Sequence, residues 1–208
     1  MARLLDSERK PRRTQAERRA ATRSALLDAA IECLVEEGYA NLTTRKVAER
    51  AGVSQGAQMH YFPTRAEFVA ESVRHLAKKL SLEIRDQLPP DASGDRRRLE
   101  WLLDQVWAVH NGPVFQATME LWVAARTDPE LRKSLRDVTR DVTRMIAAGG
   151  ADLFPELMSK PGAAELLDTS LASMRGLAML GALGNPRDVA RRWRATRTHL
   201  LELYAALS

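Results

Sequence analysis

The chain has 208 residues, of which 45% are hydrophobic and 28% are charged, and its formal net charge at pH 7 is +5. This length is sufficient for a small head and a larger body, each with a hydrophobic core of its own. The single cysteine excludes an internal disulfide and indicates a reducing cytoplasm. Since no apolar run approaches the ~20 residues of a membrane span and no hydrophobic signal region follows Met1, we expect a cytoplasmic protein.

The excess positive charge is confined to the first part of the chain. Residues 1–85 hold 16 Lys and Arg against 11 Asp and Glu, whereas residues 86–208 hold 16 of each kind. A polyanion such as DNA would bind the basic part. Basic N-terminal segments are also common in other proteins, so the charge alone does not decide between these interpretations.

Residues 1–13 are basic and lack apolar periodicity, which predicts a flexible arm. This arm could reach into a DNA minor groove, or it could be a solvated tail. The capping-box pattern Thr14-Gln15-Ala16-Glu17 then begins a helix, which Gly38 is expected to end. The apolar stripe of that helix is formed by Leu27, Ala30, Ile31 and Leu34.

Residues 41–65 predict a short helix, a tight turn and a second short helix. Thr43 or Thr44 supplies the N-cap of the first helix, and Gly52 ends it because glycine adopts a left-handed conformation without steric cost. Phe62-Pro63 stops the second helix. A short turn with a glycine between two helices is typical of a helix-turn-helix, whose second helix enters the DNA major groove.

These residues also form an ordered set: Thr43-Thr44-Arg45-Lys46-Val47-Ala48, Ala51-Gly52-Val53-Ser54, Gly56, and His60-Tyr61-Phe62-Pro63 followed by Arg65. With Glu36-Glu37-Gly38-Tyr39 before it, the set resembles the DNA-binding domain of the TetR/AcrR family of transcriptional regulators, over roughly residues 14–68. Two positions depart from the family pattern. Gln58 stands where an aliphatic residue is common, and Met59 stands where the family commonly has a Tyr that touches a DNA phosphate.

The side chains with the reach to read base edges are Arg45, Gln55, Gln58 and His60. Arginine pairs bidentately with guanine, and glutamine with adenine. The resemblance implies base-facing positions at Arg45, Gln55 and Ala57, and Ala57 could contact a thymine methyl group. It implies phosphate-binding positions at Thr44, Tyr61 and Arg65. The alternatives are core packing for the Tyr61 ring and plain solvent exposure for Arg65.

A second capping pattern, Thr64-Arg65-Ala66-Glu67, begins a long helix whose apolar positions continue to Leu88, before Pro89-Pro90. At 1.5 Å per residue this helix is a rod of ~30 Å or more that joins head to body. We therefore divide the chain into the arm at residues 1–13, a helix-turn-helix DNA-binding domain at 14–64 and a helical effector-binding and dimerisation domain at 65–208.

The remaining sequence predicts further helices and no strand, so the fold class is all-α with about nine helices. Asp128-Pro129 and Asn185-Pro186 begin two of the helices, whereas Gly149-Gly150 and residues 155–162 predict a loop. Glu120-Leu121-Trp122, followed by Ala-Arg-Thr-Asp-Pro-Glu-Leu at 125–131, resembles the family's ligand-binding and dimerisation domain.

Apolar faces of three body helices carry aromatic and methionine residues, which favours a pocket for an apolar or aromatic effector. Its candidate lining residues are Trp107, His110, Phe115, Met119, Trp122 and Met174. Ordinary core packing is the alternative, and only the resemblance favours a small molecule. The last two helices predict a homodimer packed as a four-helix bundle, with packing inside one chain as the alternative. The candidate dimer residues are Leu167, Leu171, Met174, Trp193, Leu200 and Leu207.

No catalytic or metal-binding pattern is present, because the histidines are isolated and the glycine-rich nucleotide loops and G-x-S-x-G are absent. We therefore expect no enzymatic activity, no metal and no cofactor. The predicted function is a ligand-responsive repressor that binds palindromic double-stranded DNA as a homodimer and is released by a small effector. The alternative is a DNA-binding regulator of the same fold whose C-terminal domain binds a protein partner.

Overall fold

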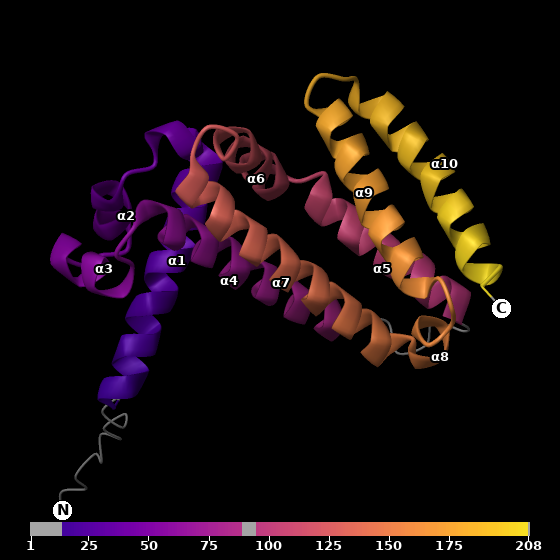
Figure 1. Cartoon of the computed structure of the whole chain (residues 1–208), viewed down its shortest axis with the longest axis horizontal. Coiled ribbons are helices and arrows are strands. Elements are labelled where there is room, and N and C mark those ends of the chain that lie inside the picture. The colour runs from indigo at the N-terminus through magenta and orange to yellow at the C-terminus, as the bar shows by residue number, and fades with distance from the viewer. Residues whose placement is uncertain (1–13, 89–94, 208) are drawn as a thin grey trace, which may run out of the picture.

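The computed structural model describes residues 14–88 and 95–207, and every regular element in these ranges is a helix (Figure 1). The predicted arm at residues 1–13 lies outside them. The helices are α1 Gln15–Asn41, α2 Thr44–Arg50, α3 Gln55–Tyr61, α4 Arg65–Asp86, α5 Asp95–His110, α6 Pro113–Ala124, α7 Pro129–Leu153, α8 Pro155–Met158, α9 Ala163–Gly181 and α10 Pro186–Ala205. The all-α fold class, with an N-terminal helix-turn-helix, is confirmed. None of these helices is both long and apolar enough to cross a membrane.

Side-chain caps begin the head helices where the sequence predicts them. Thr14 and Glu17 form a complete capping box at α1, with the Thr14 amide donating to Glu17 Oε2 over 2.7 Å. Thr43, and not Thr44, caps α2 by accepting from the Lys46 amide over 3.3 Å. The turn to α3 passes through Gly52 at φ 66°, a left-handed conformation that favours glycine. Local sequence therefore determines the helix-turn-helix geometry.

The long connecting helix is α4, whose 22 residues span about 33 Å at 1.5 Å per residue. Thr64 caps it by accepting a hydrogen bond from the Glu67 amide over 3.1 Å. Figure 1 shows α4 lying side by side with α7, and the two helices contact each other along their lengths. The rod thus runs from α3 in the head to the far end of the body.

Two clusters of buried residues form the core. One cluster joins the head to the body, because α1, α2 and the first turns of α4 pack with α6 and the start of α7; among its buried side chains are Leu26, Val47, Phe68, Leu121 and Leu131. The other cluster lies between α5, α9 and α10, where Trp107 stacks on Trp193 with ring centroids 4.9 Å apart. Head and body therefore share apolar packing across the predicted boundary between residues 64 and 65.

The body differs from the prediction at one segment. Gly149 and Gly150 do not form a loop but lie inside α7, which continues to Leu153. A mid-helix glycine costs only about 1 kcal/mol relative to alanine, and the helix continues because apolar residues on both sides of the pair, among them Ile146 and Leu153, face an interior cavity. The one-turn helix α8 also falls inside the predicted 155–162 loop, which raises the count from about nine helices to ten within the described ranges.

The inward face of α3 carries a polar side chain, Gln58. It is 0% exposed, and neither its amide nitrogen nor its amide oxygen has a hydrogen-bond partner within the described residues. The prediction that Gln58 reads base edges is therefore wrong, because a fully buried side chain cannot reach a base. Gln55, one turn earlier on the helix, is exposed.

Replacing Gln58 with leucine should raise the free energy of unfolding by about 1–3 kcal/mol, because the change removes a buried amide that makes no hydrogen bond and keeps an apolar side chain of similar size. Chemical denaturation monitored by circular dichroism measures this change. The matched control Gln55→Leu, on the exposed face of the same helix, should change the value by less than about 0.5 kcal/mol. A lower stability for Gln58→Leu would show that the amide supports the fold.

Candidate nucleic-acid interface and ligand cavity

The outer face of α2 and α3 presents most of the predicted base readers. Arg45, Gln55 and His60 are exposed, and Ala57 is half-buried between them in sequence. His60 Nε2 lies 3.4 Å from an Arg19 nitrogen, which places a cation of α1 beside the recognition helix. Figure 1 shows α2 and α3 at the outer end of the molecule, away from α9 and α10. This face is therefore accessible to a large partner such as a DNA duplex.

The charge on this surface is only partly neutralised. Lys46 pairs with Glu37, and Arg50 pairs with Glu36 over 2.7 Å. Arg18 and Arg45, in contrast, make no ion pair within the part of the chain that the structure describes. Exposed cations of the head that form no ion pair are available to a phosphate backbone.

The predicted phosphate-binding positions lie at the edge of the same face. Thr44 and Tyr61 are half-buried, and the Tyr61 ring packs against the core shared by head and body. Arg65 is exposed, but its guanidinium donates to the Tyr39 carbonyl oxygen and lies 4.2 Å from the centroid of the Tyr39 ring. Arg65 therefore links the start of α4 to the end of α1, and its contact with a phosphate stays a prediction.

Tyr39 also forms a polar contact between head and body. Gly38 interrupts α1 at φ 75°, and the Tyr39 amide donates to Glu120 Oε2 on α6 over 3.0 Å. The positive φ favours glycine, and a Cβ atom at position 38 would lie 2.7 Å from that oxygen and displace the Glu120 carboxylate. The sequence indicated the helix end at Gly38 but not its contact with Glu120, which appeared there as part of the segment that resembles the ligand-binding and dimerisation domain.

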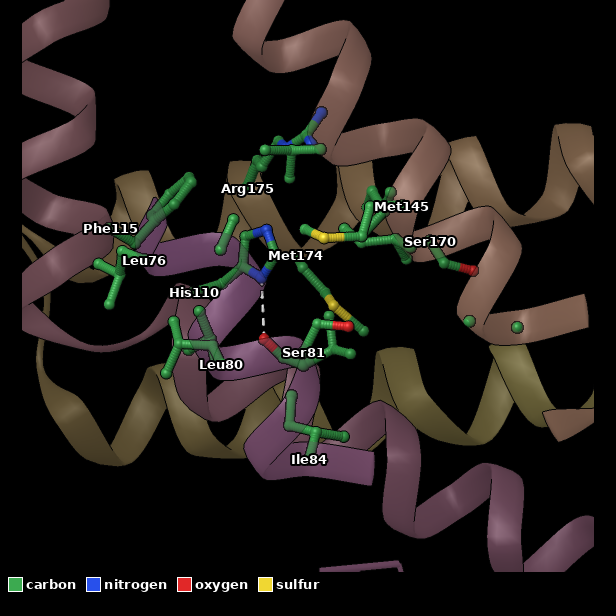
Figure 2. A pocket seen from close by; sticks show the side chains of 18 of the residues that line it. Leu76, Leu80, Ser81, Ile84, His110, Phe115, Met145, Ser170, Met174 and Arg175 are labelled. Carbon is green, nitrogen blue, oxygen red and sulfur yellow. Dashed lines mark hydrogen bonds between the residues drawn. The ribbon is translucent and has the colours of Figure 1, made fainter. Parts of the chain in front are cut away.

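The body contains a cavity of about 270 Å³, bounded mainly by α4, α5, α6, α7 and α9, with further lining residues from α1, α8 and α10 (Figure 2). Of the predicted lining residues, His110, Phe115, Trp122 and Met174 line it. Trp107 and Met119 do not, because Trp107 stacks on Trp193 and Met119 packs against the same cluster. The sequence missed the opposite wall, formed by α4 and α7 residues such as Leu76, Leu80, Ile84 and Met145. Their apolar spacing was visible, but it indicated only helix packing.

Few polar groups face this mostly apolar space. His110 Nδ1 donates to the Val106 carbonyl oxygen over 2.8 Å. Burial lowers the pKa of His110; the hydrogen bond to Val106 opposes this shift, and the charge of Arg175 adds to it. The imidazole is therefore neutral at pH 7, with Nδ1 carrying the proton. Ser170, which also lines the cavity, donates to the Leu166 carbonyl oxygen over 2.7 Å.

The predicted dimer residues lie mainly inside the chain. Leu171, Met174, Trp193 and Leu200 are buried, while Leu167 and Leu207 are half-buried. The structure thus assigns the four buried side chains to the body's own core, which was the alternative interpretation of the apolar stripes. The exposed apolar residues of this region, on α9, on α10 and in the turn between them, are instead Met179, Leu180, Leu183 and Leu203. No group of three or more metal-binding side chains occurs in residues 14–88 and 95–207.

Residues 26–71 match the family described as bacterial regulatory proteins, tetR family. The chain is 34% identical over 149 residues to an uncharacterized HTH-type transcriptional regulator of Mycobacterium tuberculosis, covering 69% of this chain and 76% of that relative. It is 33% identical over 169 residues to the HTH-type transcriptional regulator CymR of Pseudomonas putida, covering 81% of this chain and 83% of CymR.

Solved structures agree with these relatives. A transcriptional regulator from Rhodococcus sp. Rha1 is similar with a TM-score of 0.65 and 26% identity, covering 86% of this chain and 96% of that one. A regulator from Saccharomonospora viridis in complex with choline shares the fold with a TM-score of 0.60 at 19% identity, covering 90% and 97%. FadR from Bacillus subtilis in complex with stearoyl-CoA also does so with a TM-score of 0.60 at 15% identity, covering 88% and 98%. From its sequence relatives and its fold, this chain belongs to the TetR family of bacterial transcriptional regulators.

Proposed function

We propose that this regulator is a ligand-responsive repressor that acts in the cytoplasm, binds a palindromic operator as a homodimer, and leaves the DNA when a small, mostly apolar effector binds. The observation that carries the proposal is that helices lining the cavity also pack against the DNA-binding head. The helix-turn-helix presents Arg45 and Gln55 to solvent, and the body encloses a cavity whose walls include α4 and α6. Both helices pack against α1 of the head.

The cavity favours a small-molecule effector over a protein partner. A body that acted only through a protein partner would have a filled interior, whereas this one holds about 270 Å³ of mostly apolar space with His110 and Ser170 in its wall. That volume lies just below the ~300–1,000 Å³ of typical small-molecule sites, so it suits a small effector. Two proteins of the same fold were solved with choline and with stearoyl-CoA, which supports ligand binding by this kind of body.

The dimer is proposed through the exposed faces of α9 and α10. These helices pack against each other at the end of the molecule opposite α3 (Figure 1). The turn between them exposes Leu183 at 97%, and Met179 and Leu180 on α9 are each 56% exposed. Large apolar side chains exposed on these helices indicate a protein contact, and a two-fold dimer would place two recognition helices on the two halves of a palindrome.

The effector is proposed to act by moving α4 and α6. Helix α4 lines the cavity with Leu76, Leu80 and Ile84, and its first turn adjoins the recognition helix. Helix α6 lines the cavity with Phe115 and Trp122, and its Glu120 accepts a hydrogen bond from the Tyr39 amide. A packed core transmits displacement instead of absorbing it, so a ligand between these helices shifts the head. A few ångströms of added separation break the ~34 Å spacing that two successive major grooves require.

Gln55→Ala should weaken operator binding by ~1–3 kcal/mol and leave binding to random DNA unchanged, because the glutamine would read bases and not phosphates. The operator is first located by footprinting on DNA next to the protein's own gene. Fluorescence anisotropy then gives both affinities. The slope of log affinity against log salt concentration should stay the same, because the substitution removes no charge. The control Gln58→Leu should preserve selectivity. An equal loss on both DNAs would remove Gln55 from base recognition.

Leu203→Glu should convert dimers into monomers, because it places a charge on the exposed face of α10 that the proposed contact would bury. Leu203 is 51% exposed within one chain, so the change spares the core. Sedimentation velocity at micromolar concentration measures the state of assembly. The control Val123→Glu changes an exposed valine of α6 and should leave the dimer intact. A monomeric wild type would contradict the proposed interface.

Glu120→Ala should leave effector affinity unchanged but reduce the effector's ability to release DNA, because it removes the hydrogen bond between α6 and the Tyr39 amide. Coupling between sites is typically ~1–3 kcal/mol and must be reciprocal. Calorimetric titration of an effector into free and operator-bound protein measures it directly. Gln116→Ala, an exposed position on the same helix, is the control. Coupling of wild-type size in Glu120→Ala would show that α4 alone carries the signal.

A further inference from the structure

Arg175 is the one feature of the cavity that an apolar effector leaves unexplained. It extends from α9 into the cavity wall, where it is half-buried. Its Nε atom is buried without a hydrogen-bond partner, and its guanidinium makes no ion pair within the described residues. Its guanidinium carbon lies 5.9 Å from the centroid of the Trp122 ring. The other arginine that lines the cavity, Arg85, already pairs with Asp152 over 3.1 Å.

A cation in this position is costly to the free protein. Removing a charge from water is unfavourable unless a partner compensates for it. Burial lowers the pKa of Arg175, and the charge of the exposed Asp168 opposes this shift. Arginine nevertheless stays protonated in proteins. The wall of the cavity therefore contains a positive charge that forms no ion pair within the described residues.

We propose that Arg175 binds the carboxylate of an amphipathic, singly charged acid, whose apolar part fills the rest of the cavity. This inference rests on the proposed function, since it names the chemical class of the effector. Figure 2 shows Arg175 on one side of the cavity, above His110, with Leu80 and Ile84 on the other side. A ligand that is anionic at one end and apolar along its body matches this division.

The surroundings favour a carboxylate over other head groups. A planar guanidinium pairs with a carboxylate through two parallel hydrogen bonds. A doubly charged phosphate would need a second free cation, but Arg85 is already neutralised by Asp152. A cationic ligand would be repelled by Arg175. A long acyl chain is disfavoured by the volume of about 270 Å³, so the fitting ligands are short or aromatic acids.

The test compares acids with uncharged amides of the same shape, using 3-phenylpropanoate against 3-phenylpropanamide and octanoate against octanamide on the full chain. Thermal shift and tryptophan fluorescence measure binding, because Trp122 lies beside the guanidinium. In the wild type each acid should bind about 10- to 100-fold more tightly than its amide, which corresponds to a charge-assisted hydrogen bond. Arg175→Gln should reduce this preference to less than about twofold. The control Arg85→Gln should retain it.

A second measurement does not depend on the choice of acid. Ligand-free Arg175→Met should melt at a higher temperature than the wild type, because it removes an unpaired, partly desolvated cation. A lower melting temperature would show that the guanidinium supports the fold, and the inference would fail. Acids and amides that bind equally well, or acids that do not bind at all, would also overturn it.

The proposed function is tested separately by the anisotropy of labelled operator DNA. Acids that bind through Arg175 should also release the DNA. If acids and amides bind equally and both release DNA, the regulator has an effector cavity but Arg175 is not its anchor. If acids bind through Arg175 without releasing DNA, the anchor stands and the proposed repressor mechanism fails.

Discussion

The structure depends on the apolar core that the head and the body share. Leu27 of α1 and Phe68 of α4 pack in the same cluster as Leu121 of α6 and Leu131 of α7, and all four side chains are fully buried. Because the core is continuous from head to body, the two parts cannot move independently of each other. The DNA-binding surface and the cavity are therefore two faces of one packed unit, and a change of packing at one face must be accommodated at the other.

Polar contacts give this shared core a defined geometry. Glu120 of α6 accepts a hydrogen bond from the Tyr39 amide, and Arg65 of α4 donates to the Tyr39 carbonyl oxygen. Tyr39, at the end of α1, is thus hydrogen-bonded to both α4 and α6, two helices that also line the cavity. Hydrogen bonds to charged groups are worth about 1.5–3 kcal/mol, which is the scale on which an effector shifts a two-state equilibrium.

Features that depend on neighbours in the sequence could be predicted. The caps at Thr14 and Thr64, the left-handed Gly52 and the continuous helix α4 each follow from a few adjacent residues. Features that depend on tertiary partners could not. The pair Gly149-Gly150 stays helical because its neighbours have partners in the interior, which local propensity does not include.

Side-chain direction was the main source of error at the candidate sites. An apolar stripe shows that a face is buried but not whether its partner lies in the same chain, so Trp193 and Leu200 were assigned to a dimer seam and lie in the core. Glutamine is usually exposed, which made the buried Gln58 resemble a base reader. Charged residues in a helix suggest solvent, so neither Glu120 at the contact with Tyr39 nor Arg175 in the cavity was identified.

The most direct test of the account is the distance between the two recognition helices in solution. Spin labels at Glu49→Cys, an exposed position on α2 outside the candidate DNA contacts, report the separation of the two heads by double electron–electron resonance after the buried Cys33 is replaced by alanine. The operator-bound dimer should give one distribution, consistent with helices ~34 Å apart. An acid that binds the cavity should shift that distribution by several ångströms. An unchanged distribution with the acid bound would show that the cavity and the DNA-binding surface are not coupled through the shared core.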